Sequence, residues 1–264
     1  DRMKGWALRL KPAGGNIGVS RGQLPDSILM GIGFINLYQA TPVNGVYLQN
    51  AGLMWLLPLV IAVTGAALFM NNLTSAKASL KDQLAIIKRK HTWIMSYIYI
   101  GTFGSFIGYS AAFPLLLKTQ FPEITVGIAF LGPLVGSLSR PLGGLLADRI
   151  GGAIVTFWNF IAMGAATIGA LYFLGTKDFV GFLAMFLILF VTTGVGNGST
   201  YRMIPSIFRE ENRRKVQGLG EAACAAAMKT AGIESGAALG FIGAIGACGG
   251  YLIPSGFGKS IALT

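Results

Sequence analysis

Seven long apolar segments dominate the sequence and limit most strongly what this chain can fold into. They cover roughly the residues 13–37, 51–70, 92–117, 124–147, 152–174, 179–205 and 231–253. Each reaches the about 20 residues that an α-helix needs to cross the hydrocarbon core of a bilayer. We therefore predict an all-α, polytopic membrane protein.

The chain has too few charged residues to cover the surface of a soluble protein of its length. Asp, Glu, Lys and Arg make up 12% of its 264 residues, whereas a soluble domain has about 25%. One histidine and two widely separated cysteines exclude a bis-histidine haem and an iron–sulfur cluster, so we expect no cofactor and no metal site. The segments hold no nucleophile–base pair, and we do not expect an enzyme.

The basic residues fall mainly on one side of the predicted helices. If successive segments alternate in direction, the first side carries Arg2, Lys4, Arg9, Lys11, Lys77, Lys81, Lys88, Arg89, Lys90, Arg149, Arg209, Arg213, Arg214, Lys215 and Lys229. Only Lys118, Lys177 and Lys259 lie on the second side. Because Lys and Arg gather on the cytoplasmic side, the first side should be cytoplasmic. The net charge of +11 then indicates orientation and contact with anionic lipids, not with nucleic acid.

Arg140 is the strongest functional candidate inside the segments. A charged side chain there costs about 3 kcal/mol on insertion scales, and Arg140 stands among small residues over 132–144. Its planar, permanently charged guanidinium suits a small oxyanion better than the point charge of a lysine. The alternative is a structural cation paired with carbonyls or an acid. Arg21 and Arg202 also fall inside segments, and Arg202 is close enough to the cytoplasmic boundary to extend towards it.

Acidic residues are scarce in the apolar segments. Only Asp26 and Glu234 fall within them or at their ends. A proton-coupled carrier usually places Asp, Glu or His deep in a helix as a relay. A fixed cation without such a partner favours the exchange of one anion for another.

Glycines recur every three or four residues along the last segment. They are Gly232, Gly236, Gly240, Gly243, Gly246 and Gly249. Such a stripe indicates either tight helix packing or a helix that slides or bends as a carrier alternates.

The segment Gly143-Gly144-Leu-Leu-Ala-Asp148-Arg149-Ile-Gly151-Gly152 resembles the cytoplasmic loop motif of the major facilitator superfamily. It lies between the fourth and fifth apolar segments, on the side that the charges assign to the cytoplasm. The resemblance implies that the glycines permit a tight turn, and that the Asp and the basic residue lock neighbouring helix ends.

Four further stretches, over 15–20, 91–108, 118–122 and 238–254, resemble the nitrate/nitrite porter family of that superfamily, of the bacterial respiratory NarK type. This resemblance covers nearly the whole chain and implies twelve membrane helices in two bundles. Residues 1–70 would end the N-terminal bundle as helices 5 and 6, and 71–91 would form a cytoplasmic amphipathic linker. Residues 92–264 would form helices 7 to 11 of the C-terminal bundle, with the last helix missing. We expect the chain to be an internal fragment.

The resemblance also implies site residues. Arg140 would be one of two arginines that clamp a planar anion, with Tyr99, Phe103 and Asn16 as its neighbours. The motif residues Gly143, Gly144, Asp148 and Arg149, together with the stripe glycines Gly240, Gly243 and Gly246, would serve conformational change. Gly243 replaces a serine that is frequent in the family, and Arg21 and Arg202 stand where uncharged residues are expected.

These expectations combine into a carrier of the bacterial cytoplasmic membrane that exchanges nitrate for nitrite by alternating access. We expect nitrate, nitrite and membrane lipids as its partners, and a monomer when intact. The alternatives are a proton-coupled nitrate symporter of the same family, a carrier for another small anion, and an anion channel or non-transporting membrane scaffold.

Overall fold

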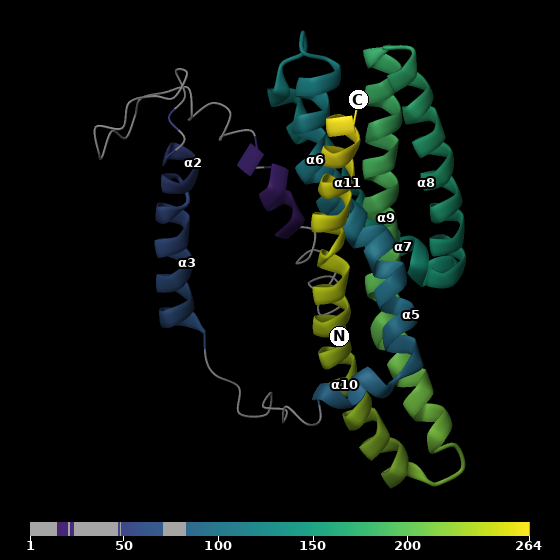
Figure 1. The fold of residues 1–264 in the computed structure, drawn as a ribbon. Helices are drawn as coiled ribbons and strands as arrows, with labels where there is room; N and C mark the ends of the chain where they lie inside the picture. Colours follow the sequence, from purple (N-terminus) through teal and green to yellow (C-terminus); the bar gives the residue numbers. More distant parts are fainter. Residues whose placement is uncertain (1–14, 21, 24–46, 48, 71–82, 264) are drawn as a thin grey trace. The chain divides into compact units, whose positions relative to one another are not determined.

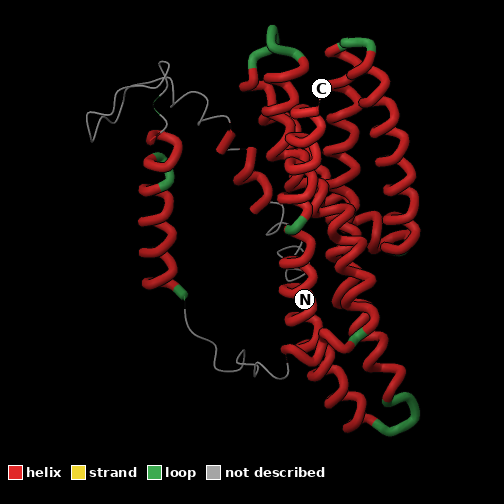
Figure 2. The backbone as a smooth tube through the Cα atoms, viewed as in Figure 1, coloured by secondary structure: helices red, strands yellow, loops and turns green. Residues whose placement is uncertain are grey.

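A computed structural model describes residues 15–20, 22, 23, 47, 49–70 and 83–263 of the chain. The chain divides into two compact units, one formed by Ser20–Lys77 and the other by Asp1–Val19 with Ala78–Thr264. Regular secondary structure in the described ranges is helical throughout, as Figure 2 shows. The predicted all-α class is thereby confirmed.

The first unit contains two described helices, α2 (Gln49–Leu53) and α3 (Leu56–Phe69). They fall in the predicted segment 51–70, but a turn at Met54 and Trp55 separates them. With 14 residues, α3 is about 21 Å long, which is shorter than the about 30 Å of a hydrocarbon core. Most of segment 13–37, including Arg21 and Asp26, lies outside the described residues.

The second unit holds five helical runs that are long and apolar enough to cross a membrane. The first, Lys90–Gln120, joins α5 (Lys90–Tyr99) to α6 (Ser105–Gln120) through a π-helical turn, Ile100–Gly104. The others contain α7 (Leu131–Ile150), α8 (Gly152–Gly175), α9 (Phe179–Lys215), and α10 (Glu221–Ala247) followed by α11 (Gly249–Leu263). These runs confirm the last five predicted segments.

Local sequence explains several helix ends in this unit. Asp178 precedes α9, and its carboxylate accepts hydrogen bonds from the backbone N–H groups of Val180 and Gly181 at 3.1 and 3.3 Å. This is the usual way in which an aspartate caps a helix N-terminus. Gly151 ends α7 with a φ of 92°, a conformation that glycine adopts without strain.

The predicted apolar segments 179–205 and 231–253 leave the basic stretch Arg209–Lys229 between them, which predicts a long basic loop there, and this prediction is wrong. Helix α9 continues to Lys215 and α10 begins at Glu221. Glu210 pairs with Arg213 and Arg214, three and four residues later, and such pairs favour the helix. The actual turn is short and uses Gly218 and Gly220, which have φ values of 93° and 87°.

Helix α9 lies at the centre of the second unit and packs against α7, α8 and α10. A cluster rich in phenylalanine joins α6, α8 and α9, and its largest fully buried members are Phe106, Phe113, Phe121, Phe182 and Phe190. Another cluster contains Ile86, Met95, Tyr99, Ile204, Phe208, Ala238 and Ile242. The outer face of α8 is apolar and exposed, with Phe157, Trp158, Ile161 and Ile168. Such a face suits lipid.

Several turns of this unit lie at its two opposite ends, as Figure 1 shows. The α6–α7 loop and the α8–α9 turn lie together, and Lys177 Nζ donates a hydrogen bond to Gln120 Oε1 across them at 2.8 Å. The start of α5 and the α9–α10 turn lie at the opposite end. This separation matches the two sides that the basic residues predict.

Candidate functional site

Arg140 is held where α7 and α9 approach most closely. The residue is only 6% exposed. A Cβ on Gly198 of α9 would overlap the Arg140 carbonyl oxygen, and one on Gly194 would overlap the Gly136 carbonyl oxygen and Ser139 Oγ. The backbones can touch because these α9 residues are glycines. Arg140 is therefore fixed by main-chain packing as well as by its side-chain contacts.

Two tyrosines accompany the Arg140 guanidinium. Its Nη2 donates a long hydrogen bond of 3.5 Å to Tyr99 Oη, and its Cζ lies 5.3 Å from the centre of the Tyr201 ring. Tyr99 is 2% exposed, and its ring stacks on Phe103 with centres 5.0 Å apart. We call Arg140, Tyr99, Phe103 and Tyr201 the arginine–aromatic cluster. It combines one fixed positive charge with hydroxyl groups and apolar ring faces.

The π-helical turn places two members of this cluster beside α10. Tyr99 immediately precedes the turn and Phe103 lies within it. A Cβ on Gly246 would lie 2.6 Å from Tyr99 Cδ1 and 3.4 Å from Phe103 Cδ1. Position 246 must remain glycine for these rings to keep their places.

The predicted conformational glycines occupy different environments. A Cβ on Gly143 would overlap the Val195 backbone, whereas one on Gly144 would first meet Gly198 O at 3.9 Å. At Gly240 and Gly243, an added Cβ would meet nothing within 4 Å in the described structure. The stripe on α10 thus packs tightly at Gly246 and is open at the two earlier positions.

Asp148 of the loop motif forms its ion pair with α9, 54 residues later in the chain. Its Oδ1 accepts a hydrogen bond from Arg202 Nε at 2.7 Å. The neighbouring Arg149 is exposed, and among the described residues it has no ion pair. Arg202, which stands where an uncharged residue is expected, is thus a basic partner of Asp148 in this structure.

Asn16 lies on a short helical stretch over 15–20. Its Nδ2 is enclosed and has no hydrogen-bond partner in the described part of the chain. The structure therefore brings Arg140, Tyr99 and Phe103 together but gives Asn16 no hydrogen bond to them.

Tyr201 is the member of the arginine–aromatic cluster that sequence reasoning missed. It follows a small polar stretch, Gly198-Ser199-Thr200, and precedes Arg202. An aromatic residue that directly follows a glycine-rich stretch within an apolar segment was the only signal that the sequence offered. The contact itself depends on the register between α7 and α9, which the sequence does not reveal.

A separate charged cluster ties the start of α5 to α9 and α10. Arg89 Nη2 donates to Glu234 Oε1 at 2.5 Å, and Arg89 Nη1 lies 3.5 Å from Glu211 Oε1. Asn212 Nδ2 donates to Glu234 Oε2 at 2.6 Å. Glu234 is 7% exposed, so both of its carboxylate oxygens are satisfied in a nearly closed environment.

We expect Glu234→Ala to lower the free energy of unfolding by about 2–3 kcal/mol, because it leaves the half-buried Arg89 without its shortest partner. Thermal unfolding of the full-length protein in detergent would measure this. Glu210→Ala is the matched control, since its ion pairs are exposed and should contribute little. Equal losses of stability in the two variants would contradict the expectation.

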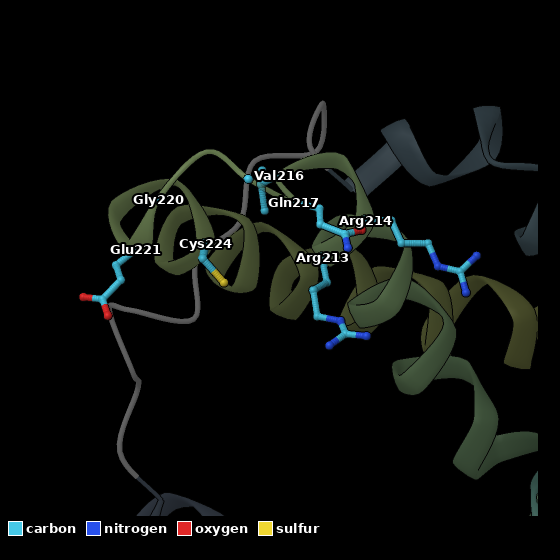
Figure 3. A pocket seen from close by; sticks show the side chains of 8 residues that line it. Arg213, Arg214, Val216, Gln217, Gly220, Glu221 and Cys224 are labelled. Atoms are coloured by element: carbon cyan, nitrogen blue, oxygen red, sulfur yellow. The ribbon is translucent and has the colours of Figure 1, made fainter.

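The α9–α10 turn contains a hollow of about 380 Å³, which Figure 3 shows from close by. Its lining consists of Arg213, Arg214, Val216, Gln217, Gly218, Gly220, Glu221 and Cys224. The arginines are paired with Glu210, and none of the lining residues belongs to the arginine–aromatic cluster. Within the described ranges, no group of three or more His, Cys, Asp or Glu side chains could hold a metal ion.

Long apolar helices around a buried, permanently charged arginine define a polytopic helical membrane protein with an internal polar site. The chain is 42% identical over 275 residues to the nitrate/nitrite transporter NarU of Escherichia coli (strain K12), covering 99% of this chain and 58% of that protein. It is 39% identical over 226 residues to the probable nitrate/nitrite antiporter NarK2 of Thermus thermophilus, covering 78% of this chain and 50% of that protein. No family model matches the chain.

The chain therefore belongs to the nitrate/nitrite porter family of the major facilitator superfamily. It spans about half the length of these relatives. Its apolar helices and its bacterial relatives make it a multi-pass protein of the bacterial cytoplasmic membrane. This outcome confirms the family and the location expected from the sequence.

Proposed function

We propose that this chain contributes to a carrier that exchanges nitrate for nitrite across the cytoplasmic membrane by alternating access. One observation carries the proposal: the permanent charge of Arg140 is 6% exposed within a membrane helix and is surrounded by tyrosine and phenylalanine rings. The relatives named as nitrate/nitrite transporters and antiporters support the choice of anions.

The arginine–aromatic cluster suits a small planar anion for physical reasons. The guanidinium can present two parallel N–H donors to two oxygens of nitrate or nitrite. The Tyr99 hydroxyl can add a further donor. Coulomb attraction grows as the local dielectric falls, so the stacked rings of Tyr99 and Phe103 strengthen the binding of the anion.

The placement of the described carboxylates favours exchange over proton-coupled uptake. Asp148 pairs with Arg202, and Asp178 caps α9. Glu234, one of the two acidic residues that the sequence placed within the apolar segments or at their ends, is bound by Arg89 and Asn212. Each of these carboxylates already accepts hydrogen bonds from other groups of the protein, which leaves it poorly placed to act as a proton relay.

The remaining assignments extend this proposal. Residues 1–70 would belong to the N-terminal bundle, 71–91 to a linker, and 92–264 to the C-terminal bundle of a monomeric carrier in contact with anionic lipids. Asn16 would bind the anion. The motif residues Gly143, Gly144, Asp148 and Arg149, with Gly240, Gly243 and Gly246, would serve the conformational change. We do not expect the protein to be an enzyme.

Counterflow in proteoliposomes tests the function directly. Vesicles that contain the full-length protein and internal nitrite should release nitrite when nitrate is added outside, and much less when chloride is added. Uptake of nitrate that follows an imposed pH gradient without internal nitrite would instead identify a symporter. Exchange of another oxyanion in preference to nitrate would reassign the substrate.

A further inference from the structure

Asn197 on α9 is a buried amide without a hydrogen-bond partner. The residue is 0% exposed, and neither its Nδ2 nor its Oδ1 is hydrogen-bonded in the described structure. Buried polar groups are nearly always paired, and an unpaired one needs an explanation.

Asn197 differs in this respect from the polar residues around it on the same helix. The hydroxyls of its buried neighbours donate to carbonyls of the preceding turn; these neighbours are Thr192, Thr193, Ser199 and Thr200. A hydroxyl can make such a bond within its own helix. The Asn197 amide does not, and its two donors and its acceptor remain available for a partner from elsewhere.

The contacts of neighbouring residues show which way the Asn197 side chain leaves α9. A Cβ on Gly196 would meet Asn159 Nδ2 of α8 at 2.5 Å and Thr102 Cγ2 of the π-helical turn at 2.7 Å, and one on Gly198 would overlap the Arg140 carbonyl. Around the axis of α9, the Asn197 side chain is rotated by about 100° from position 196 and by about 100° from position 198. Its side chain therefore leaves α9 between α7 and the π-helical turn.

The next turn of α9 supports this direction. Thr200 Oγ1 lies 3.1 Å from Thr102 Oγ1, while the Tyr201 ring lies below the Arg140 guanidinium. Tyr201 is four residues after Asn197 and shares its helix face. Asn197 thus belongs to the face of α9 that contributes to the arginine–aromatic cluster.

We propose that Asn197 is a further anion-binding residue, whose Nδ2 donates a hydrogen bond to the oxyanion held by Arg140. This inference rests on the proposed function. Nitrate and nitrite offer acceptors only, so the amide must turn its N–H₂ group towards the anion. Because the Asn197 amide is neutral, it would add a hydrogen bond to the anion without adding a second fixed positive charge at this position.

Binding of sodium nitrate to the full-length protein, measured by calorimetry against sodium chloride at equal ionic strength, tests the proposal. Asn197→Leu has a similar volume and removes an unpaired polar group, so it should fold as well as the wild type. We expect its Kd for nitrate to rise at least about tenfold, a loss that is typical of one hydrogen bond to a charged group, with no fall in the melting temperature.

Thr193→Val is the matched control, because the Thr193 hydroxyl is buried one turn earlier but already bonded to the Phe190 carbonyl. Its Kd for nitrate should stay close to that of the wild type. An unchanged Kd in Asn197→Leu would overturn the proposal and leave the proposed function intact. A wild-type protein that binds no nitrate would overturn both. If Asn197→Leu does not fold, Asn197→Ala provides the same comparison.

Discussion

Replacement of Arg140 by lysine is expected to abolish most nitrate–nitrite exchange. Lysine keeps the positive charge but cannot present the two parallel donors that grip two oxygens of a planar anion. The lysine side chain is also shorter than that of arginine. Because the backbone at position 140 is fixed against Gly198, the ammonium group would lie farther from Tyr99 and Tyr201. Losing a hydrogen bond to a charged group costs about 1.5–3 kcal/mol, so the loss of exchange should reach about 100-fold.

Nitrite efflux from proteoliposomes of the full-length protein would measure this effect. Arg209→Lys is a suitable control, because it makes the same chemical change at an exposed residue near the end of α9, away from the arginine–aromatic cluster. Comparable efflux from Arg140→Lys and wild type would show that only charge matters at position 140. That result would remove the bidentate contact from the proposed mechanism.

The second large effect is expected from Gly198→Ala. The added methyl group would overlap the Arg140 carbonyl oxygen, and a backbone atom cannot move aside as a flexible side chain can. Helices α7 and α9 would have to separate at the position of the charged residue. We expect a loss of stability of about 3 kcal/mol, together with a loss of transport because Arg140 is displaced.

Thermal unfolding in detergent and efflux from proteoliposomes would test both parts of this prediction. Gly164→Ala on α8 is the control, since a methyl group there meets nothing within 4 Å in the described structure. Alanine favours the helix over glycine, so this variant should be as stable as the wild type. If Gly198→Ala matched Gly164→Ala in both assays, the close approach of α7 and α9 at this point would be refuted.

The sequence predicts those parts of the fold that depend on local composition. Apolar runs located the five long helical segments of the second unit, and the placement of basic residues assigned the two ends of the bundle. Arg140 was identifiable as a site candidate because a charge within an apolar segment is costly wherever its neighbours lie. None of these predictions depends on which helices pack against each other.

The parts that failed or were missed depend on contacts between distant residues. The pair of Asp148 and Arg202 joins two helices, so nothing in the motif, where Arg149 directly follows Asp148, points to Arg202 as a partner. The π-helical turn before α6 has no sequence rule of its own and is accompanied by close packing of Gly104 on Gly246. By contrast, the length of α9 could have been foreseen, because Glu210 and Arg214 are separated by the four residues typical of a helical ion pair.

The length of α9 has a consequence for how this half of the protein can move. Its 37 residues extend about 55 Å, well beyond a hydrocarbon core of about 30 Å. Lys177 and Asp178 precede its first residue, and Arg202, the next charged residue along the helix, follows about 36 Å after Asp178. Sliding the helix along the membrane normal in either direction would drag charged groups into lipid tails, at a cost of several kcal/mol. The position of the helix along the membrane normal is therefore fixed at both surfaces, and its motions are confined to tilting and rotation within the membrane.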